Sequence, residues 1–406
     1  MSLRNAAPRS AGLFSERLRE FWSPTLSRDT AGMPVGRDPR LDMFRGIALV
    51  MIFINHVPGT VYETFTNRNF GFSDAAEAFV FMSGVAAGLA YSPSFRAGSL
   101  WAATAWVWAR ARHLYFIHIG ITMMTLGIFA AAALWFGLPQ VLQTNNVSPV
   151  LSKPLSTLVG IPLLTHQLGY LNILPLYAAL LLATPLVMLI GLKRPWLMLA
   201  LSVALWATAG QFRLNLPSFP NPGGWFFNPF SWQILFVVGL LSGAAMKAGK
   251  RFIPYHPMLF GLAAAFVIFV LLWVRVPALG EAGRSMLSTI AGWGAPFYIT
   301  WFDKTFLALP RLLHALALFY VLGHLPVMLS IARSPLTAPL RAMGRQGLAV
   351  FATGTVLSMA LQVVKLPRQP DPLFDGLILG GGLVLLVGLA YVLNYTAGLK
   401  ARPKAA

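Results

Sequence analysis

The chain has 406 residues, of which 57% are hydrophobic and only 11% are charged, a composition that excludes an ordinary soluble protein. The absence of cysteine excludes disulfides and thiol catalysis. The net charge of +19 would suit nucleic-acid binding, but lysines and arginines also gather in the cytoplasmic loops of membrane proteins, and the apolar composition favours this second explanation. We therefore predict an all-α polytopic membrane protein embedded in a lipid bilayer, with no nucleic-acid partner.

Residues 1–38 are polar, basic and rich in Ser, Pro and Arg, without the apolar centre of a cleavable signal peptide. We predict a mostly disordered cytoplasmic tail for this stretch. Residues 39–400 are predicted to form a single transmembrane domain, and residues 401–406 a short cytoplasmic tail at the C-terminus.

Hydrophobic runs along the chain predict about ten transmembrane helices. An even number of spans puts both termini on the same side of the membrane. The loops on that side carry most of the lysines and arginines, which predicts that both termini are cytoplasmic. The predicted spans are 41–61, 74–93, 106–136, 168–192, 195–211, 229–247, 256–275, 306–332, 338–364 and 374–397.

The first predicted span carries Arg45 near its start and His56 near its end. Eleven residues make almost three helical turns, so the two side chains share a face and lie about 16 Å apart along the axis. Pro58 and Gly59 are expected to end the helix two residues past His56. Histidine is a common general base, and an ionisable residue within a membrane helix predicts a functional site. The alternative is a buried histidine whose ring is satisfied by a neighbouring carbonyl.

Arg45 lies inside an apolar run, where a topology signal is not needed, and Asp42 is a candidate partner three residues earlier. Together with Arg40, Arg110 and Arg112, it is predicted to bind the phosphates of a donor at the cytoplasmic mouth. The alternative for these arginines is the ordinary excess of positive charge on cytoplasmic loops.

The second predicted span opens with two carboxylates, Asp74 and Glu77, which share a helix face because they are three residues apart. Either side chain is a candidate to orient or charge-balance His56. The alternative is an N-terminal cap with an acid in the first turn. The same face continues through Gly84 and Gly88, which would let another helix approach closely.

Three segments on the opposite side of the membrane are longer than ordinary linkers, namely 137–167, 212–228 and 276–305. They combine aromatic residues with amides and a few charges, which suits sugar binding because pyranose rings stack on aromatic rings and hydroxyls bind amides. The alternative is the aromatic belt at the bilayer interface. Arg311 and His314 follow at the outer start of the eighth span, where they could face a cavity or Arg311 could extend to the interface.

Motifs of zinc proteases, serine hydrolases and phosphate loops are absent from the sequence, and we predict no metal site. His113 and His118 are five residues apart and do not share a helix face, which disfavours a metal pair. The sequence also shows no internal repeat, which weighs against a transporter built from repeats.

Arg45 and His56 match the Arg-x10-His pattern of the membrane acyltransferase-3 superfamily, and one branch resembles the chain more closely. The stretches RDPRLDMFRGIALVMIFINHVP and RNFGFSDAAEAFVFMSG look like the OpgC family, succinyltransferases of osmoregulated periplasmic glucans. The motifs LNILPLY from Leu171, NPFSWQ from Asn228, RLLH from Arg311 and GRQ from Gly344 are similar to this family too. The resemblance extends from Arg37 almost to the C-terminus.

The resemblance implies a multi-pass enzyme of the bacterial inner membrane that moves a succinyl group from cytoplasmic succinyl-CoA to hydroxyls of a periplasmic glucan. His56 would act as the base, with Glu77 or Asp74 orienting it. No permanently bound cofactor is implied. The candidate contacts to the acceptor and the acyl group are Arg68, Asn69, Asn172, Trp232, Gln233, Arg311 and His314.

The chain departs from the family pattern at two positions. Asn55 and Asn172 stand where family members usually carry Asp, and an amide cannot stabilise an imidazolium as a carboxylate does. An acetyl donor or another glycan acceptor is therefore an open alternative. A transporter or flippase, with the same charged residues as coupling groups and gates, is an alternative of another class. The acyl group could move directly from donor to acceptor or through a covalent acyl-enzyme. The protein could act as a monomer or as an oligomer.

Overall fold

The computed structural model describes residues 37–401, and its secondary structure is helical. Within these residues the strand-like pairing is an isolated bridge between Pro217 and Gly224. The predicted tails, 1–38 and 401–406, lie outside the described residues except for three positions at their inner ends. The longer helices are α2 (Pro39–Asn55), α3 (Ala75–Ala97), α4 (Leu100–Trp135), α7 (Ile173–Gly191), α8 (Pro195–Gln211), α9 (Pro229–Lys247), α10 (Pro257–Arg275), α11 (Pro277–Gly292), α13 (Leu309–His324), α16 (Gly347–Lys365) and α17 (Pro372–Ala401). The shorter helical segments are η1 (Val61–Phe65), η2 (Asn67–Asn69), η3 (Pro139–Gln143), α5 (Ser148–Ser152), α6 (Pro154–Gly160), α12 (Phe297–Thr300), α14 (Val327–Arg333), η4 (Pro335–Thr337) and α15 (Ala338–Arg345).

The predicted fold class, an all-α polytopic membrane protein, is confirmed. Among the described residues, seven helices are long and apolar enough to cross a membrane, or eight if α13 and α14 form one broken span. Helices α2 and α8 have 17 residues each and fall just short of the others in length. Every predicted span corresponds to one of these helices or helix pairs, but the count of ten is not confirmed.

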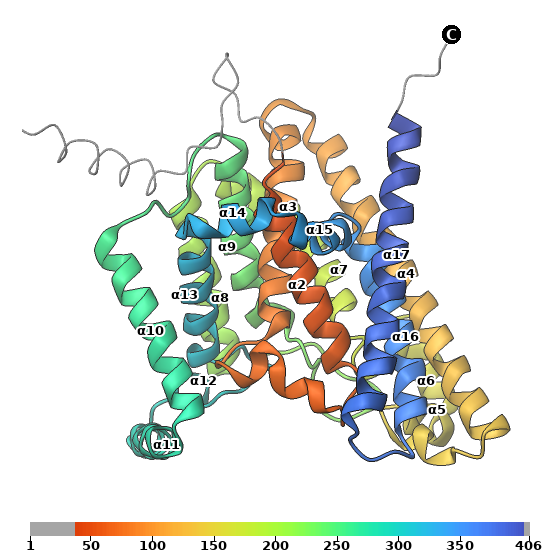
Figure 1. Ribbon diagram of the computed structural model, residues 1–406. Coiled ribbons are helices and arrows are strands. Elements are labelled where there is room, and N and C mark those ends of the chain that lie inside the picture. Colours follow the sequence, from red (N-terminus) through yellow and green to blue (C-terminus); the bar gives the residue numbers. More distant parts are fainter. Residues whose placement is uncertain (1–36, 402–406) are drawn as a thin grey trace, which may run out of the picture.

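Two of the predicted spans are not single helices. The span predicted at 306–332 breaks between α13 and α14, which meet at an angle of 75°. Pro326 at the break cannot donate the backbone hydrogen bond that a continuous helix needs there. The span predicted at 338–364 divides at Gln346 into α15 and α16, and Figure 1 shows α14 and α15 lying across α2 instead of along it.

Close backbone packing joins α3 to α9, as Gly84 and Gly88 predicted. A Cβ atom on either glycine would overlap the backbone of α9, and one on Gly239 or Gly243 would overlap the backbone of α3. Without a hydrophobic driving force between helices in lipid, small residues of this kind permit the contact area that holds helices together. The same device joins α15 to α2, where a Cβ on Gly344 would overlap the backbone of Asp42.

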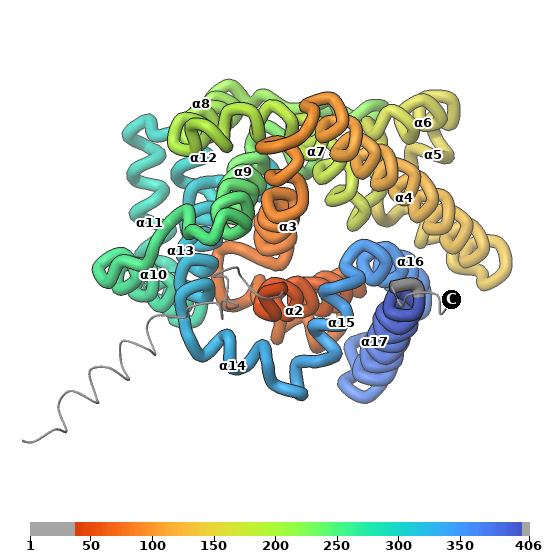
Figure 2. The backbone as a smooth tube through the Cα atoms, turned by 90° about the horizontal axis from the view of Figure 1, so that it is seen from above, coloured from red at the N-terminus to blue at the C-terminus, as the bar shows by residue number. Residues whose placement is uncertain are grey.

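Helix α2 runs through the centre of the bundle and connects its two sides. Figure 1 shows α2 starting on the side where α17 ends, so the two described ends of the chain lie on the same side. Figure 2 shows α2 between α3 on one side and α14 and α15 on the other, with α16 and α17 beside it. Arg45 and His56 therefore mark positions near opposite sides of the bundle.

Candidate functional site

His56 lies immediately after the last turn of α2. The helix ends at Asn55, and the His56 backbone N–H donates to the Ile52 carbonyl at 2.9 Å. The prediction that Pro58 and Gly59 end the helix is therefore nearly right, since α2 stops one residue before the histidine and not two residues after it. The half-buried His56 ring is tilted against Tyr170 with the ring centroids 4.8 Å apart. Its Nδ1 atom is enclosed and has no hydrogen-bond partner among the described residues.

The backbone around His56 is held by the hairpin of α16 and α17. Gln362 of α16 donates from Nε2 to the His56 carbonyl at 2.7 Å, and its Oε1 accepts from Asn145 Nδ2 at 2.6 Å. Asp375 at the start of α17 accepts from the Val61 backbone N–H at 3.0 Å. These contacts fix the loop that begins at His56 against helices from the other end of the chain.

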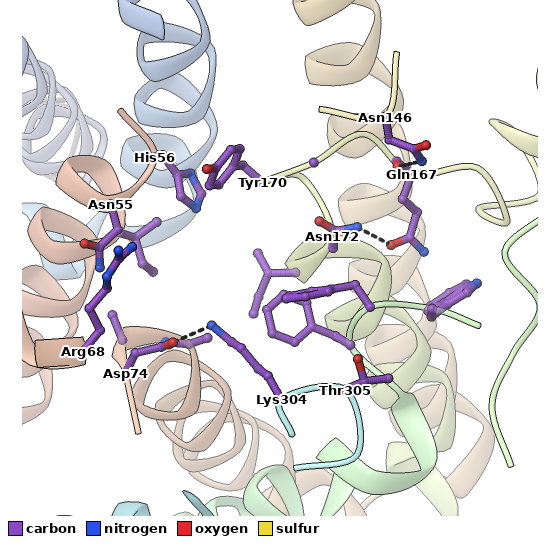
Figure 3. A pocket seen from close by; sticks show the side chains of 18 of the residues that line it. Asn55, His56, Arg68, Asp74, Asn146, Gln167, Tyr170, Asn172, Lys304 and Thr305 are labelled. Atoms are coloured by element: carbon purple, nitrogen blue, oxygen red, sulfur yellow. Dashed lines mark hydrogen bonds and ion pairs between the residues drawn. The ribbon is translucent and has the colours of Figure 1, made fainter. Parts of the chain in front are cut away.

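A cavity of about 600 Å³ opens beside His56. Figure 3 shows His56 and Tyr170 on one side of it and Lys304 on the other, with Lys304 reaching towards Asp74. Segments from all parts of the chain contribute to its wall, including two of the three predicted sugar-binding segments and the end of the third. The lining residues are Ile52, Asn55, His56, Arg68, Asp74, Ala75, Ala76, Asn146, Gln167, Gly169, Tyr170, Asn172, Ile173, Ser218, Gly224, Trp225, Phe226, Phe227, Lys304, Thr305 and Phe351.

Asp74, Glu77, Lys304 and Arg311 form an acid–cation quartet at the edge of this cavity. Arg311 donates to Glu77 Oε1 from Nε at 2.8 Å and from Nη2 at 2.5 Å, and its Nη2 lies 3.3 Å from Asp74 Oδ2. Lys304 Nζ lies 2.5 Å from the same Asp74 oxygen. The two negative and two positive side chains are therefore paired with each other within the protein.

Neither carboxylate of the quartet makes a hydrogen bond or ion pair with the His56 ring, so the hypothesis that one of them orients it stays a prediction. Glu77 is fully buried, and its second oxygen accepts the Asp74 backbone N–H at 2.9 Å. Asp74 Oδ1 accepts the Ala76 N–H at 2.8 Å, so the two acids form a capping box for α3. The capping alternative is thus confirmed, although Asp74 also lines the cavity.

The predicted acceptor residues fall into two groups. Arg68 and Asn172 line the cavity, as does Asn55, whose Oδ1 accepts from Thr66 at 2.8 Å. The others lie outside the cavity wall and make structural contacts within the described residues. Asn69 bonds the Glu63 carbonyl, Trp232 the Lys304 carbonyl, Gln233 the Ser202 carbonyl, Arg311 the quartet, and His314 the Ser73 hydroxyl at 2.7 Å.

Lys304 and Tyr170 are cavity residues that the sequence reasoning missed. Lys304 lies in the segment 276–305, which stood out for its tryptophans and charged residues, but it was not among the candidate site residues. Tyr170 follows Gly169 and adopts a left-handed backbone conformation with φ 67°, which is uncommon for a bulky residue and turns its ring towards His56. Burial raises the pKa of the Tyr170 hydroxyl, which therefore stays protonated and able to donate a hydrogen bond at neutral pH.

The predicted phosphate-binding arginines are only partly brought together. Arg45 donates to the Gly344 carbonyl at 3.2 Å, and both Arg45 and Arg110 lie within electrostatic range of Tyr177 on α7. Arg40 instead pairs with Asp38 at 2.8 Å, and Arg112 is exposed on α4. Arg45 is absent from the residues that line the cavity, whose wall reaches Ile52, about 10 Å from Arg45 along α2.

The partners of Asp42 complete this side of the molecule. Its carboxylate pairs with Arg37 at 2.5 Å, with Arg345 at 3.6 Å and with Arg45 at 3.9 Å. Two of these three arginines are more than half exposed. One buried carboxylate thus serves three cations, and the excess positive charge faces outwards.

Across the described part of the chain, no three His, Asp or Glu side chains are arranged to hold a metal ion. No curated protein matches the chain. A family model, described as OpgC protein, matches residues 37–397, which include α2, the quartet and the whole cavity wall. With a match over most of its length, the chain belongs to the OpgC family and is an acyltransferase-type membrane protein.

Proposed function

We propose that this protein is an O-acyltransferase that moves a succinyl group from cytoplasmic succinyl-CoA to hydroxyl groups of a periplasmic glucan. The observation that carries the proposal is the cavity at the end of α2, which brings a histidine, a lysine and several amides together beside aromatic rings. Family membership supports the reaction class, and the contents of the cavity support the choice of substrates.

The wall of the cavity suits a carbohydrate acceptor. Trp225, Phe226 and Phe227 supply aromatic faces on which sugar rings can stack. Asn146, Gln167 and Asn172 supply amides that can bind hydroxyls, and Asn172 is held towards the wall by a bond to Gln167 at 3.2 Å. A glucan would therefore lie against the aromatic side with one hydroxyl directed at His56.

The reaction we assign to this geometry is a direct transfer. Because Nδ1 of His56 is enclosed, Nε2 is the atom that takes the proton from the glucan hydroxyl. The resulting alkoxide attacks the thioester carbonyl, a new ester C–O bond forms and the C–S bond breaks. The imidazolium then returns its proton to the leaving thiolate, which gives free CoA and leaves His56 neutral.

The orientation follows from the charge of the two sides. The arginine-rich side around Arg45 and Asp42 would face the cytoplasm of a bacterial inner membrane, with both termini on that side. Acyl-CoA would bind there through its phosphates, and its thioester arm would cross the 10 Å or so between Arg45 and Ile52. Residues 39–400 would act as one transmembrane domain, with succinyl-CoA as a substrate and no permanently bound cofactor.

The test is acyl transfer by purified protein in detergent, where transport cannot be scored. Wild-type protein with succinyl-CoA and a glucan oligosaccharide should give a product heavier by one succinyl group in mass spectrometry. His56→Ala should lower kcat at least about 100-fold, since a general base contributes that much or more. His113→Ala, at an exposed position on α4 outside the cavity, is the matched control and should keep full activity.

Four results would change the proposal. Full activity of a folded His56→Ala variant would remove His56 from the mechanism. A product heavier by one acetyl group would favour the alternative donor, and modification of only a different glycan would favour another acceptor. Failure of the wild-type protein to transfer from any acyl-CoA, with glycan movement across vesicles instead, would favour a transporter or flippase.

A further inference from the structure

Lys304 is the cation of the acid–cation quartet that reaches into the cavity. It lines the wall together with Asp74, whereas Arg311 and Glu77 lie behind that wall. The Lys304 side chain is 28% exposed and that of Arg311 only 12%. Figure 3 shows the Lys304 ammonium in the space between Asp74 and the histidine side of the cavity.

The backbone that carries Lys304 is firmly anchored. The indole N–H of Trp232 donates to the Lys304 carbonyl at 2.9 Å, and the indole N–H of Trp206 donates to the Leu307 carbonyl at 3.0 Å. Asn228 donates its backbone N–H to the Thr305 carbonyl at 3.3 Å. Two buried tryptophans thus fix the backbone from which Lys304 extends, and its side chain ends in the ion pair with Asp74 at the cavity wall.

The charges around Lys304 allow its ammonium to bind a second anion. An ammonium has three N–H donors, and the ion pair described for Lys304 is the one with Asp74. If the ammonium turns towards a ligand, Asp74 keeps Arg311 at 3.3 Å and the Ala76 N–H at 2.8 Å. The rings of Phe226 and Phe227, with centroids 5.9 and 5.6 Å from Nζ, flank the cation without neutralising it.

We propose, resting on the function proposed above, that Lys304 binds the free carboxylate of a dicarboxylic acyl group and so selects succinyl-type donors over acetyl. When the thioester carbonyl of a succinyl group lies near His56, the free carboxylate at the other end of that group lies in the same cavity. Lys304 can bind it there. The added carboxylate also gives the site one net negative charge beside the imidazolium that forms during transfer. A neutral acyl group gains neither contact.

Arg68 is the competing cation in the cavity, and it is one of the acceptor and acyl contacts predicted from the sequence. Its side chain is 47% exposed and pairs with Glu63 at 3.1 Å. Both partners belong to the short segments η1 and η2, outside the quartet. A salt bridge that faces water contributes little to binding, so Arg68 serves as the matched control for Lys304.

The experiment compares kcat/KM for succinyl-CoA and acetyl-CoA, with the same glucan oligosaccharide, in wild-type protein and in Lys304→Met and Arg68→Met. Lys304→Met should lower the ratio of succinyl to acetyl transfer by roughly 10- to 100-fold, the loss expected for a charge-assisted hydrogen bond. Acetyl transfer should persist, which shows that the variant is folded. Lys304→Arg should keep most of the preference, and Arg68→Met should change the ratio less than about threefold.

A second measurement needs no variant. The methyl ester of succinyl-CoA keeps the length of the acyl group but removes its charge, and wild-type protein should use it no better than acetyl-CoA. An unchanged ratio of succinyl to acetyl transfer in Lys304→Met would overturn the assignment to Lys304, whether or not both activities fall. Efficient use of the methyl ester would overturn it too. If wild-type protein transfers neither acyl group, it is the proposed function that fails, and the inference falls with it.

Discussion

The charged side chains at the two ends of α2 differ in how completely they are paired. At the His56 end, Asp74, Glu77, Lys304 and Arg311 balance one another inside the protein. At the other end, the buried carboxylate of Asp42 is shared by three arginines, while Asp38 pairs with Arg40. The charges of the first arrangement balance one another, and the second leaves positive charge facing outwards.

Under the proposed function, this difference separates donor binding from the chemical step. A polyanion such as CoA is attracted by a surface with uncompensated cations, and that attraction weakens as salt screens it. A cavity for proton transfer benefits from groups that are already paired and fixed, because they need not reorganise during the reaction. Variants at the His56 end should therefore lower stability or kcat, and variants at the Arg45 end should raise KM for the donor.

The largest effect is expected at Glu77. Glu77→Gln leaves the Arg311 guanidinium in a buried position with only Asp74 as an acid, and breaking such a pair costs about 3–5 kcal/mol of unfolding free energy. Thermal unfolding in detergent measures the loss. Glu281→Gln, at an exposed position on α11, is the control and should stay within about 0.5 kcal/mol of wild type.

A double variant sharpens the same prediction. Glu77→Gln combined with Arg311→Met removes both buried charges, so part of the lost stability should return. If Glu77→Gln unfolds at the wild-type temperature, the buried ion pair of Glu77 with Arg311 does not stabilise the fold. The contrast between the two ends of α2 would then have no energetic basis.

A smaller effect of a different kind is expected at Arg45. Arg45→Met should raise KM for succinyl-CoA about tenfold and change kcat much less, because the variant loses the charge-assisted contact that we propose with a donor phosphate. The KM of the variant should also depend less on salt than that of wild type. Arg333→Met, at an exposed position on α14, should leave KM unchanged. A fall in kcat at constant KM would place Arg45 in the chemical step and not in donor binding.

The helices were largely predictable from the sequence because each depends on a continuous apolar run. The predicted spans at 229–247 and 256–275 agree with α9 and α10 almost to the residue. The break between α13 and α14 was missed because Pro326 stands inside a run that is mostly apolar on both sides of it. Hydrophobicity alone does not distinguish a straight span from two helices that meet at a sharp angle.

The site was predictable only in part, because its partners are distant along the chain. His56 and the two acids stood out as polar groups in an apolar sequence, but Glu77 meets Arg311 across 234 residues, and no local pattern predicts that pairing. In the sequence, Lys304 has no feature that distinguishes it from other loop lysines. Its backbone is held by hydrogen bonds from Trp232 and Trp206, which are distant along the chain. Family membership indicates the reaction class, and the structure shows which of the candidate side chains line one common cavity.

The smallest effect is expected from the support behind His56. Gln362→Leu keeps the size of the side chain but removes the bonds to the His56 carbonyl and to Asn145, so the histidine loop can shift. A displacement of this kind should lower kcat about threefold and leave KM for succinyl-CoA unchanged. Gln211→Leu, at the exposed last position of α8, is the control.

The Asn145→Gly variant tests the two hydrogen bonds of Gln362 separately. It removes the bond from Asn145 and keeps the bond to the His56 carbonyl. Asn145 has φ 52°, a conformation that glycine adopts without strain, so this change removes the amide and keeps the turn. Gln362 would still reach His56, and kcat should fall less than in Gln362→Leu. Unchanged kcat in Gln362→Leu would mean that the ion pair of Lys365 with Asp375, through the bond from Asp375 to Val61, is enough to hold the loop. In that case the position of His56 depends on the α16–α17 hairpin as a whole and not on one amide.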